Sequence, residues 1–402
     1  MTQRLYYDDA YTTAFDARIV ERLVINGRPG VILDRTYFYP DSGGQPADTG
    51  LVNGAEVQAL LVRDSDAAII HILDHPITDA TVHCQVNWPR RFDHMQHHTG
   101  QHILTQAFVQ VADADTVGFH LSPDSVTIDL DRLGIPDHLV QQAEDLANQI
   151  VVENRRVSAR LIPPDAADQI RMRKAPENLL TDGLRVIDIE DFDHTACGGT
   201  HVAHTGEVGL IKIVRLEKRG DRTRVEFRCG GRALCDYRTK HAVVNRLISD
   251  LTCGLDELPE AVKRLQQENR VLQQTLKAVR EQLIEAEAAR LLAQSQDEGV
   301  HVIQVAFSGR DPGELRLLAA HLTAVPQVVA LLGSAGEKAH LVLARSTDLN
   351  LDMNSALQTA LAALGGGRGG GKPDLVQGGG QPASIEAVAG ALRAARSALA
   401  IT

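Results

Sequence analysis

Two histidines stand four residues apart in the stretch HHTGQHIL, which runs from His97 to Leu104. Residues with this spacing lie one above the other on a helix, so His98 and His102 could both bind one metal ion. A helical zinc-protease motif has a glutamate directly after its first histidine, but that position here is Thr99. The pattern therefore predicts either a metal site of another kind or a polar helix face with exposed histidines.

A second pair with the same spacing occurs about a hundred residues later, in HTACGGTHV. With five cysteines and 16 histidines in 402 residues, roughly 0.2 Cys-x-x-x-His pairs are expected by chance. Cys197 and His201 would add a thiolate and an imidazole to the helix pair, and zinc prefers such ligands. A closed site of this kind could clip the fold together, and a more open one could be catalytic. On ligand chemistry alone, both alternatives stay open.

The segments around these residues indicate an α+β protein of several domains. Residues 1–90 contain short apolar or alternating stretches separated by Asn-Gly and Gly-Gly turns, which predicts a small N-terminal β-barrel. From residue 93 to about residue 110, the apolar positions recur with a helical period. Strands and another helix follow as far as about residue 240. We therefore expect residues 91–240 to form a mixed α+β domain that contains the metal ligands.

Residues 241–295 are expected to form a helical spacer. Between residues 256 and 292, apolar side chains recur at two heptad positions over about five heptads. Asn269 lies on this seam, where a polar residue fixes the register at a cost in stability. The seam could form a coiled coil with a second copy of the chain, giving a homodimer, or it could be one arm of an intramolecular hairpin.

Residues 296–402 alternate between strand and helix patterns, which predicts a small α/β domain. Near its end lies GGGRGGGKPDLVQGGGQ, from Gly365 to Gln381. This segment could bring Arg368 and Lys372 close to phosphates, or it could be a flexible linker.

Charge distribution bears on possible partners. The net charge is −11, yet the stretch from Ile211 to Arg228 contains seven lysines and arginines against three acidic residues. An acidic protein can still bind RNA through such a local basic stripe. The alternative is a hairpin with charged, solvated faces.

The sequence has no sign of a membrane span or a disulfide framework. It contains no run of about 18 uncharged apolar residues, and its first residues, MTQRLYYDDAYTTAF, lack the apolar core of a secretory signal. The five cysteines are odd in number and scattered, which suits reduced thiols. These features predict a cytoplasmic protein.

Taken together, the motifs resemble the editing module of alanyl-tRNA synthetases. HTGQH, CGGTHV and the upstream YFYPDSGGQPADTG occur in the same order and at similar separations. Because the barrel-like segment begins within the first residues, we expect no aminoacylation domain in this chain. The chain therefore resembles a free-standing alanyl-tRNA editing protein of the long AlaX type. The Gly-rich end is similar to the C-terminal DHHA1 domain of that family.

This resemblance implies a zinc-dependent deacylase that hydrolyses the ester of serine, and secondarily glycine, mischarged on alanine tRNA. Zinc ligands that would also be catalytic are implied at His98, His102, Cys197 and His201. Candidate substrate contacts are Thr36, Gly43, Gly44, Gln45 and Gln101, with Thr36 foremost as the reader of the serine hydroxyl. Candidate tRNA contacts are Lys212, Arg215, Lys218, Arg219, Arg368 and Lys372. Gln101 departs from the synthetases, which commonly have threonine at that position.

Two other function classes are alternatives to an editing deacylase. DHHA1-like domains also follow the catalytic domains of DHH phosphoesterases, but the sequence contains no Asp-His-His. The remaining alternative is a zinc-stabilised RNA-binding protein without catalytic activity.

Overall fold

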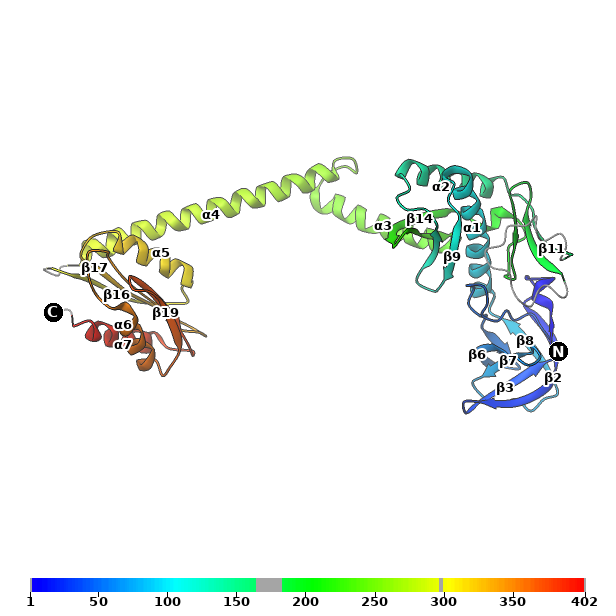
Figure 1. The fold of residues 1–402 in the computed structure, drawn as a ribbon, viewed down its shortest axis with the longest axis horizontal. Helices are drawn as coiled ribbons and strands as arrows, with labels where there is room; N and C mark the ends of the chain where they lie inside the picture. The colour runs from blue at the N-terminus through cyan, green and yellow to red at the C-terminus, as the bar shows by residue number, and fades with distance from the viewer. Residues whose placement is uncertain (1, 164–182, 296–298, 401–402) are drawn as a thin grey trace. The chain divides into compact units, whose positions relative to one another are not determined.

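The structure is a computed structural model that describes residues 2–163, 183–295 and 299–400 (Figure 1). The chain divides into two compact units, residues 1–247 and residues 248–402. Among the described residues, no helix combines the length and apolarity needed to cross a bilayer.

The first unit begins with a closed six-stranded barrel of order β2-β3-β7-β6-β5-β8. Its strands are β2 (Ala14–Ile25), β3 (Arg28–Leu33), β5 (Gly50–Val52), β6 (Ala55–Val62), β7 (Ile69–Leu73) and β8 (Thr81–Val86). Strand β8 shows the expected alternation, with its valines and Cys84 buried and the intervening residues exposed. The predicted N-terminal barrel is thus confirmed.

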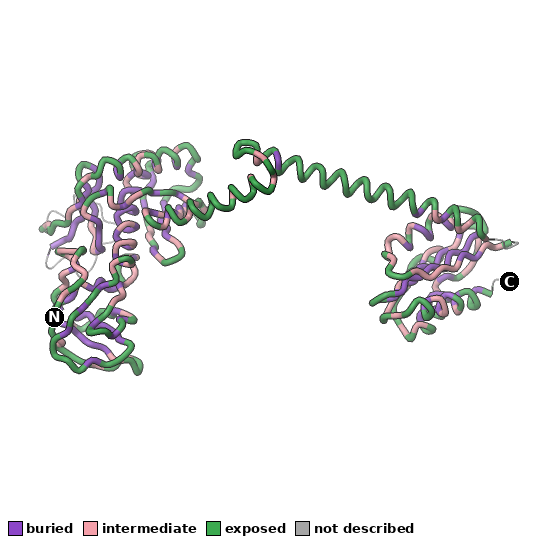
Figure 2. Tube along the Cα trace, turned by 180° about the vertical axis from the view of Figure 1, so that it is seen from behind, coloured by how far each residue is buried: buried purple, intermediate pink, exposed green. Residues whose placement is uncertain are grey.

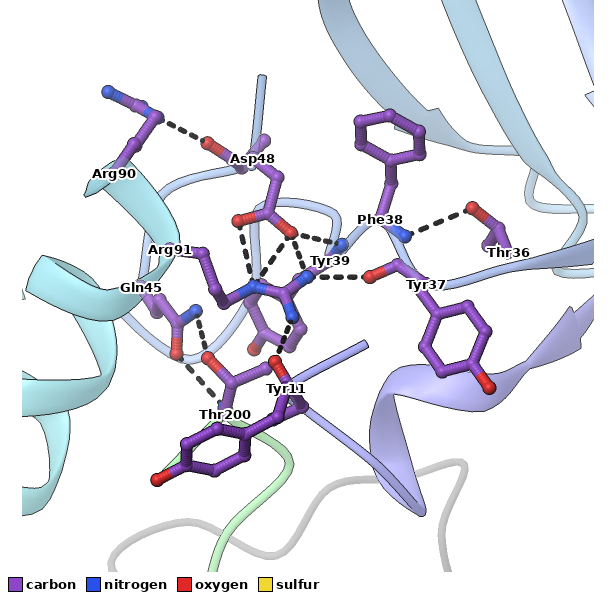
Figure 3. Close-up of polar contacts among 12 residues, drawn as sticks. Tyr11, Thr36, Tyr37, Phe38, Tyr39, Gln45, Asp48, Arg90, Arg91 and Thr200 are labelled. Atoms are coloured by element: carbon purple, nitrogen blue, oxygen red, sulfur yellow. Dashed lines mark hydrogen bonds and ion pairs between the residues drawn. The ribbon is translucent and has the colours of Figure 1, made fainter. Parts of the chain in front are cut away.

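A buried ion pair ties the connection between barrel strands β3 and β5 to the helix that follows the barrel. Helix α1 (Trp88–Ala112) begins after Asn87, whose side chain accepts a hydrogen bond from the Arg90 N–H. One turn in, Arg91 pairs with Asp48, and both side chains are fully buried (Figure 3). Arg91 also donates to the Tyr37 carbonyl at 2.6 Å. Because removing one partner of such a pair costs about 3–5 kcal/mol, this contact strongly fixes the β3–β5 connection against α1.

Helix α1 packs in a mixed α+β arrangement with two antiparallel sheets. The four-stranded sheet has the order β14-β15-β10-β9 and the three-stranded sheet the order β11-β12-β13. Their strands are β9 (Thr116–Leu121), β10 (Val126–Leu130), β11 (Val157–Ile162), β12 (Leu184–Ile189), β13 (Asp193–Ala196), β14 (Ile211–Arg219) and β15 (Arg222–Cys229). Helix α2 (Asp137–Val152) shares the core with α1.

Two long helices, α3 (Gly230–Leu251) and α4 (Leu258–Gln294), fill most of the predicted spacer. Most of α4 is exposed (Figure 2). The apolar seam is part of this exposed surface, with Leu265 54%, Leu272 67% and Leu283 68% exposed. Near its end, Ile284 and Ala288 pack into the core of the second unit. The spacer is therefore helical, and the coiled coil stays a prediction.

The second unit contains a five-stranded sheet of order β16-β17-β18-β20-β19. Its strands are β16 (His301–Ser308), β17 (Val328–Ala335), β18 (His340–Arg345), β19 (Arg368–Lys372) and β20 (Leu375–Gly379). Helices α5 (Pro312–Thr323), α6 (Met353–Ala363) and α7 (Ile385–Ala398) pack against it. The expected α/β character is confirmed, whereas the four domain boundaries given above stay a prediction.

The Gly-rich segment is neither a linker nor a loop, because it forms the edge hairpin β19–β20. Gly369 faces Gly378 across this hairpin. A Cβ atom on Gly369 would lie 2.9 Å from the side chain of Leu357 on α6 and 2.6 Å from the Gln377 carbonyl oxygen. Glycine is therefore needed where the hairpin packs closely on itself and on the helix, a tertiary requirement that composition alone does not reveal.

Candidate metal centre

Four of the predicted ligands converge in the first unit. His98 and His102 lie on α1, and Cys197 and His201 lie in the loop after β13. Their possible ligand atoms all lie within 4.8 Å of one another. The three imidazoles are at most 7% exposed. The spacing of four residues brings His98 and His102 together on α1. The loop after β13 supplies the other two candidate ligands.

In each of the three histidines, Nδ1 contacts a side-chain oxygen of a residue outside the cluster. The contacts are His98 Nδ1 to Gln45 Oε1 at 2.8 Å, His102 Nδ1 to Asp193 Oδ2 at 3.1 Å, and His201 Nδ1 to Thr99 Oγ1 at 3.2 Å. An acceptor beside Nδ1 keeps the proton on that atom and leaves Nε2 as the metal-binding nitrogen. All three histidines are thus prepared to present the same atom to one point.

The inner atoms of the cluster fit a bound cation. Cys197 Sγ lies 3.2 Å from His98 Nε2 and 3.4 Å from His201 Nε2. His102 Nε2 is buried and has no hydrogen-bond partner among the residues that the structure describes. A buried polar atom without a partner is costly, and a metal ion between the four ligands would satisfy it. One thiolate and three imidazoles are a donor set that suits zinc.

The local electrostatics favour the ligand forms of Cys197 and His201. Burial raises the pKa of the Cys197 thiol, but the neighbouring His98 and His201 imidazoles outweigh burial and hold it well below its usual value. Burial lowers the pKa of His201 to about 3 against the attraction of Cys197. Metal binding requires a deprotonated thiol and a neutral imidazole, so these two directions prepare the site for a cation.

Arg185 braces the ligand loop from β12. Its guanidinium donates to the Cys197 carbonyl at 2.8 Å and to the Gly199 carbonyl at 3.0 Å. It also lines a pocket of about 200 Å³ with Tyr7, Asp8 and His201. Neither Arg185 nor Asp193 was predicted from the sequence, although both lie close to the CGGTHV motif along the chain. Their closeness to this motif in the sequence is the signal that could have identified them.

The residues predicted to contact the substrate lie in different surroundings. Thr36 is buried, and its hydroxyl contacts His71 Nε2 at 3.0 Å. It also accepts a hydrogen bond from the Phe38 N–H (Figure 3). Gln101 is also buried and donates to Thr105 Oγ1 at 2.8 Å. Gln45 contacts the candidate metal ligand His98 through its side chain. Contact between these residues and a substrate stays a prediction.

Gly43 and Gly44 form the tight turn that precedes Gln45. Their φ angles are +58° and +84°, a left-handed conformation that glycine adopts at little cost.

The predicted tRNA contacts form two separate groups. Lys212, Arg215, Lys218 and Arg219 are exposed along β14, although Lys212 and Arg215 form ion pairs with Glu144 and Glu217.

In the second unit, Arg368 lines a pocket of about 410 Å³ together with Arg316, Lys338 and His340. Arg316 and Lys338 had no local sequence signal, because α5 and the β17–β18 turn bring them together only in the fold. Lys372 lies at the far end of β19 and is exposed.

Three family models match parts of the chain. They are tRNA synthetases class II (A) at residues 2–90, the threonyl and alanyl tRNA synthetase second additional domain at residues 184–226, and the DHHA1 domain at residues 297–400. The second match includes Cys197 and His201, and the third includes the glycine-rich hairpin.

Several curated proteins are similar over most of the chain. The alanyl-tRNA editing protein AlaX-L of Pyrococcus horikoshii is 29% identical, with 94% of each chain covered. The alanine–tRNA ligase of Pyrococcus furiosus is 32% identical over 94% of this chain and 42% of the ligase. That of Methanothrix thermoacetophila is 30% identical over 100% of this chain and 45% of the ligase. The chain thus spans less than half the length of these ligases.

A crystal structure of the C-Ala domain from Aquifex aeolicus alanyl-tRNA synthetase also matches, with 26% identity and a TM-score of 0.24. The match covers 27% of this chain and 99% of that domain. From these relatives and family matches, the chain is a homologue of the alanyl-tRNA editing protein AlaX-L, with a second additional domain of the threonyl and alanyl tRNA synthetase type and a DHHA1 domain.

Proposed function

We propose that the chain hydrolyses the ester bond of alanine tRNA mischarged with serine and, more slowly, with glycine. The similarity to an alanyl-tRNA editing protein supports editing as the general activity. The observation that carries the proposal for the reaction centre is the convergence of His98, His102, Cys197 and His201. A second candidate, a zinc-stabilised RNA-binding protein without catalysis, has the same ligand set and is separated from the first by the assay below.

The proposed cofactor is one zinc ion held by these four residues. When bound, zinc would supply Lewis-acid chemistry towards an ester carbonyl or a water molecule. Asp193 accepts a hydrogen bond from the Nδ1–H of His102, and the Thr195 hydroxyl donates to Asp193 at 2.8 Å. Thr99 contacts His201 Nδ1 and accepts from the Val202 N–H at 3.2 Å. These side chains orient the ligands, and an aminoacyl ester is activated enough to need no further strong base.

Discrimination between serine and alanine has to come from the serine hydroxyl. A pocket cannot reject alanine by size, because alanine is the smaller residue. It can leave one of its own polar groups unpaired when alanine enters, and such a site discriminates strongly. Thr36 and Gln101 remain the proposed hydroxyl readers. For Thr36 this would require its hydroxyl to share its present contact with His71.

We expect hydrolysis of seryl-tRNA(Ala) at least about a hundredfold faster than hydrolysis of alanyl-tRNA(Ala), with glycyl-tRNA(Ala) in between. The release of labelled amino acid from the three charged tRNAs measures this order. Equal rates on the seryl and alanyl esters would contradict editing. Retention of tRNA binding with no hydrolysis of any ester would favour the non-catalytic RNA-binding protein, and a faster reaction on D-aminoacyl esters would indicate another class of deacylase.

Phosphate contacts to tRNA are proposed at both basic groups. On β14 these are Lys212, Arg215, Lys218 and Arg219. In the second unit they are Arg368 and Lys372, together with Arg316 and Lys338, which share a pocket with Arg368. The three cations around this pocket and the glycine backbone at its wall suit a phosphate group, because phosphate binding depends on positive charge and close backbone approach.

Replacing Arg316, Lys338 and Arg368 together with glutamine is expected to weaken tRNA binding and flatten its salt dependence. Each lost phosphate contact should reduce the slope of log affinity against log salt by about 0.7 to 0.9. Binding titrations at several salt concentrations measure both effects. Lys277→Gln, which removes an exposed cation from α4, is the control. A triple variant with the parent slope would mean that the pocket binds no tRNA phosphate.

A homodimer through residues 256–292 is also proposed. The exposed leucines of α4 form an apolar stripe that a second copy could cover. If so, Asn269→Leu should change the association state, because a buried amide on a seam selects partner number and register. Sedimentation of both forms tests this. A parent chain that stays monomeric at every accessible concentration would argue against the dimer.

A further inference from the structure

The turn from Ser42 to Gln45 is built to deliver one side chain to the metal centre. The Ser42 and Gln45 backbones exchange hydrogen bonds at 3.2 and 3.0 Å across the two glycines. The Leu121 N–H donates to the Gly44 carbonyl at 3.2 Å, which joins the turn to strand β9. A Cβ atom on Gly44 would lie 2.8 Å from the Phe119 carbonyl oxygen. Gly44 is therefore required both by its positive φ and by the close approach to β9.

The turn places Gln45 in full burial between the two ligand-bearing segments. Gln45 Oε1 lies 2.8 Å from His98 Nδ1 and accepts from the Thr200 N–H at 3.1 Å. Gln45 Nε2 donates to Thr200 Oγ1 at 2.8 Å (Figure 3). Thr200 directly precedes the ligand His201. One carboxamide thus contacts a ligand on α1 and the backbone beside a ligand in the loop.

These contacts fix the orientation of the carboxamide and the tautomer of His98. A backbone N–H can only donate, so the atom that faces the Thr200 N–H has to be the amide oxygen. The same oxygen then faces His98 Nδ1, which must carry its proton there. His98 Nε2 is left as the lone-pair nitrogen, and it points at Cys197 Sγ, 3.2 Å away.

We propose that Gln45 is a positioning residue that holds His98 in its metal-binding tautomer and couples it to the loop of Cys197 and His201. The inference rests on the metal centre of the proposed function but not on its ester substrate. Both polar groups of the Gln45 side chain are engaged by protein, so its task differs from reading a substrate hydroxyl. Partners that orient metal-binding histidines in this way typically contribute 10- to 100-fold to metal affinity.

Gln45→Met tests the proposal, because it keeps the length of the side chain and removes its hydrogen bonds. We expect zinc affinity, measured by competition with a chelator, to fall about 10- to 100-fold. The visible absorption of the Co²⁺-loaded protein should also change, since a loosened His98 alters the ligand geometry. Gln58→Met, an exposed glutamine on β6 of the same barrel, is the matched control and should bind both metals like the parent.

Gln45→Glu is the conservative variant. A carboxylate keeps an acceptor for His98 Nδ1 and for the Thr200 N–H, so zinc affinity and the Co²⁺ spectrum should return close to those of the parent. Parent-like zinc affinity and spectrum in Gln45→Met would overturn the proposal, as would a folded Gln45→Glu variant that binds no better than Gln45→Met. If the parent protein binds zinc but hydrolyses no ester, the proposed deacylase function is wrong. The comparison of zinc affinities would still test the role of Gln45.

Discussion

Replacing Cys197 with alanine is expected to empty the metal centre and abolish deacylation. Cys197 is the anionic ligand of the four, and its pKa is held well below the usual value, so the thiolate is ready to bind a cation. Structural zinc sites are stabilised by about 10–16 kcal/mol in total. Losing a quarter of this, roughly 3 kcal/mol, corresponds to a loss in affinity of about a hundredfold or more.

Elemental analysis of protein purified without a metal-binding tag measures the first effect. The parent should contain about one zinc per chain, and Cys197→Ala should contain almost none. Cys235→Ala is the matched control, because Cys235 is a free, exposed cysteine on α3. A Cys197→Ala variant that retains the metal content of the parent would refute the ligand assignment. Loss of zinc without loss of ester hydrolysis would instead separate the metal from the chemistry.

The four candidate ligands could be predicted from the sequence because their spacing is local. Residues four apart on a helix face the same way, so the structure brings His98 and His102 together as the pattern predicts. The hydrogen-bond partners of these ligands could not be predicted in this way. His102, for example, contacts Asp193, which lies 91 residues further along the chain. No periodic pattern indicates which distant side chain will take the outer nitrogen of a histidine.

The candidate substrate residues differ from one another in their hydrogen-bond partners. Thr36, Gln45 and Gln101 are all polar residues in or beside the quoted motifs, and nothing local in the sequence indicates which of them contacts a candidate metal ligand. In the fold, Thr36 contacts His71 in the barrel and Gln101 donates along its own helix, whereas Gln45 reaches a metal ligand. The turn formed by the two preceding glycines places the Gln45 side chain against His98.

Composition is an even weaker guide where glycine is frequent. The run from Gly365 to Gln381 has the composition of a linker, yet it pairs as β19–β20. Conversely, the heptad pattern of residues 256–292 correctly predicts a helix but cannot specify what covers its apolar side. Helical period is a local property, whereas the partner of a seam depends on other parts of the chain or on another chain.

The two glycines of the CGGTHV motif are expected to respond to substitution in opposite ways. A Cβ atom on Gly199 would overlap the His98 ring at Cε1 and Nδ1 and would lie 3.0 Å from Gln45 Oε1. A Cβ atom on Gly198 would meet nothing closer than the Tyr7 hydroxyl, at 3.9 Å. Neither glycine has a positive φ, so the difference between them is one of space and not of backbone strain.

Gly199→Ala should therefore push the ligand loop away from α1, because the neighbours of the new methyl group are a rigid imidazole and a fully buried amide. We expect overpacking to cost about 1–3 kcal/mol of folding free energy and zinc affinity to fall at least about a hundredfold as His98 and Cys197 separate. Gly198→Ala should fold and bind zinc like the parent. Thermal unfolding and chelator competition on both variants measure the contrast. Equal tolerance at the two positions would mean that the loop does not pass as close to His98 as the structure has it, and equal loss at both would mean that the motif needs its glycines for a conformation that this fold does not contain.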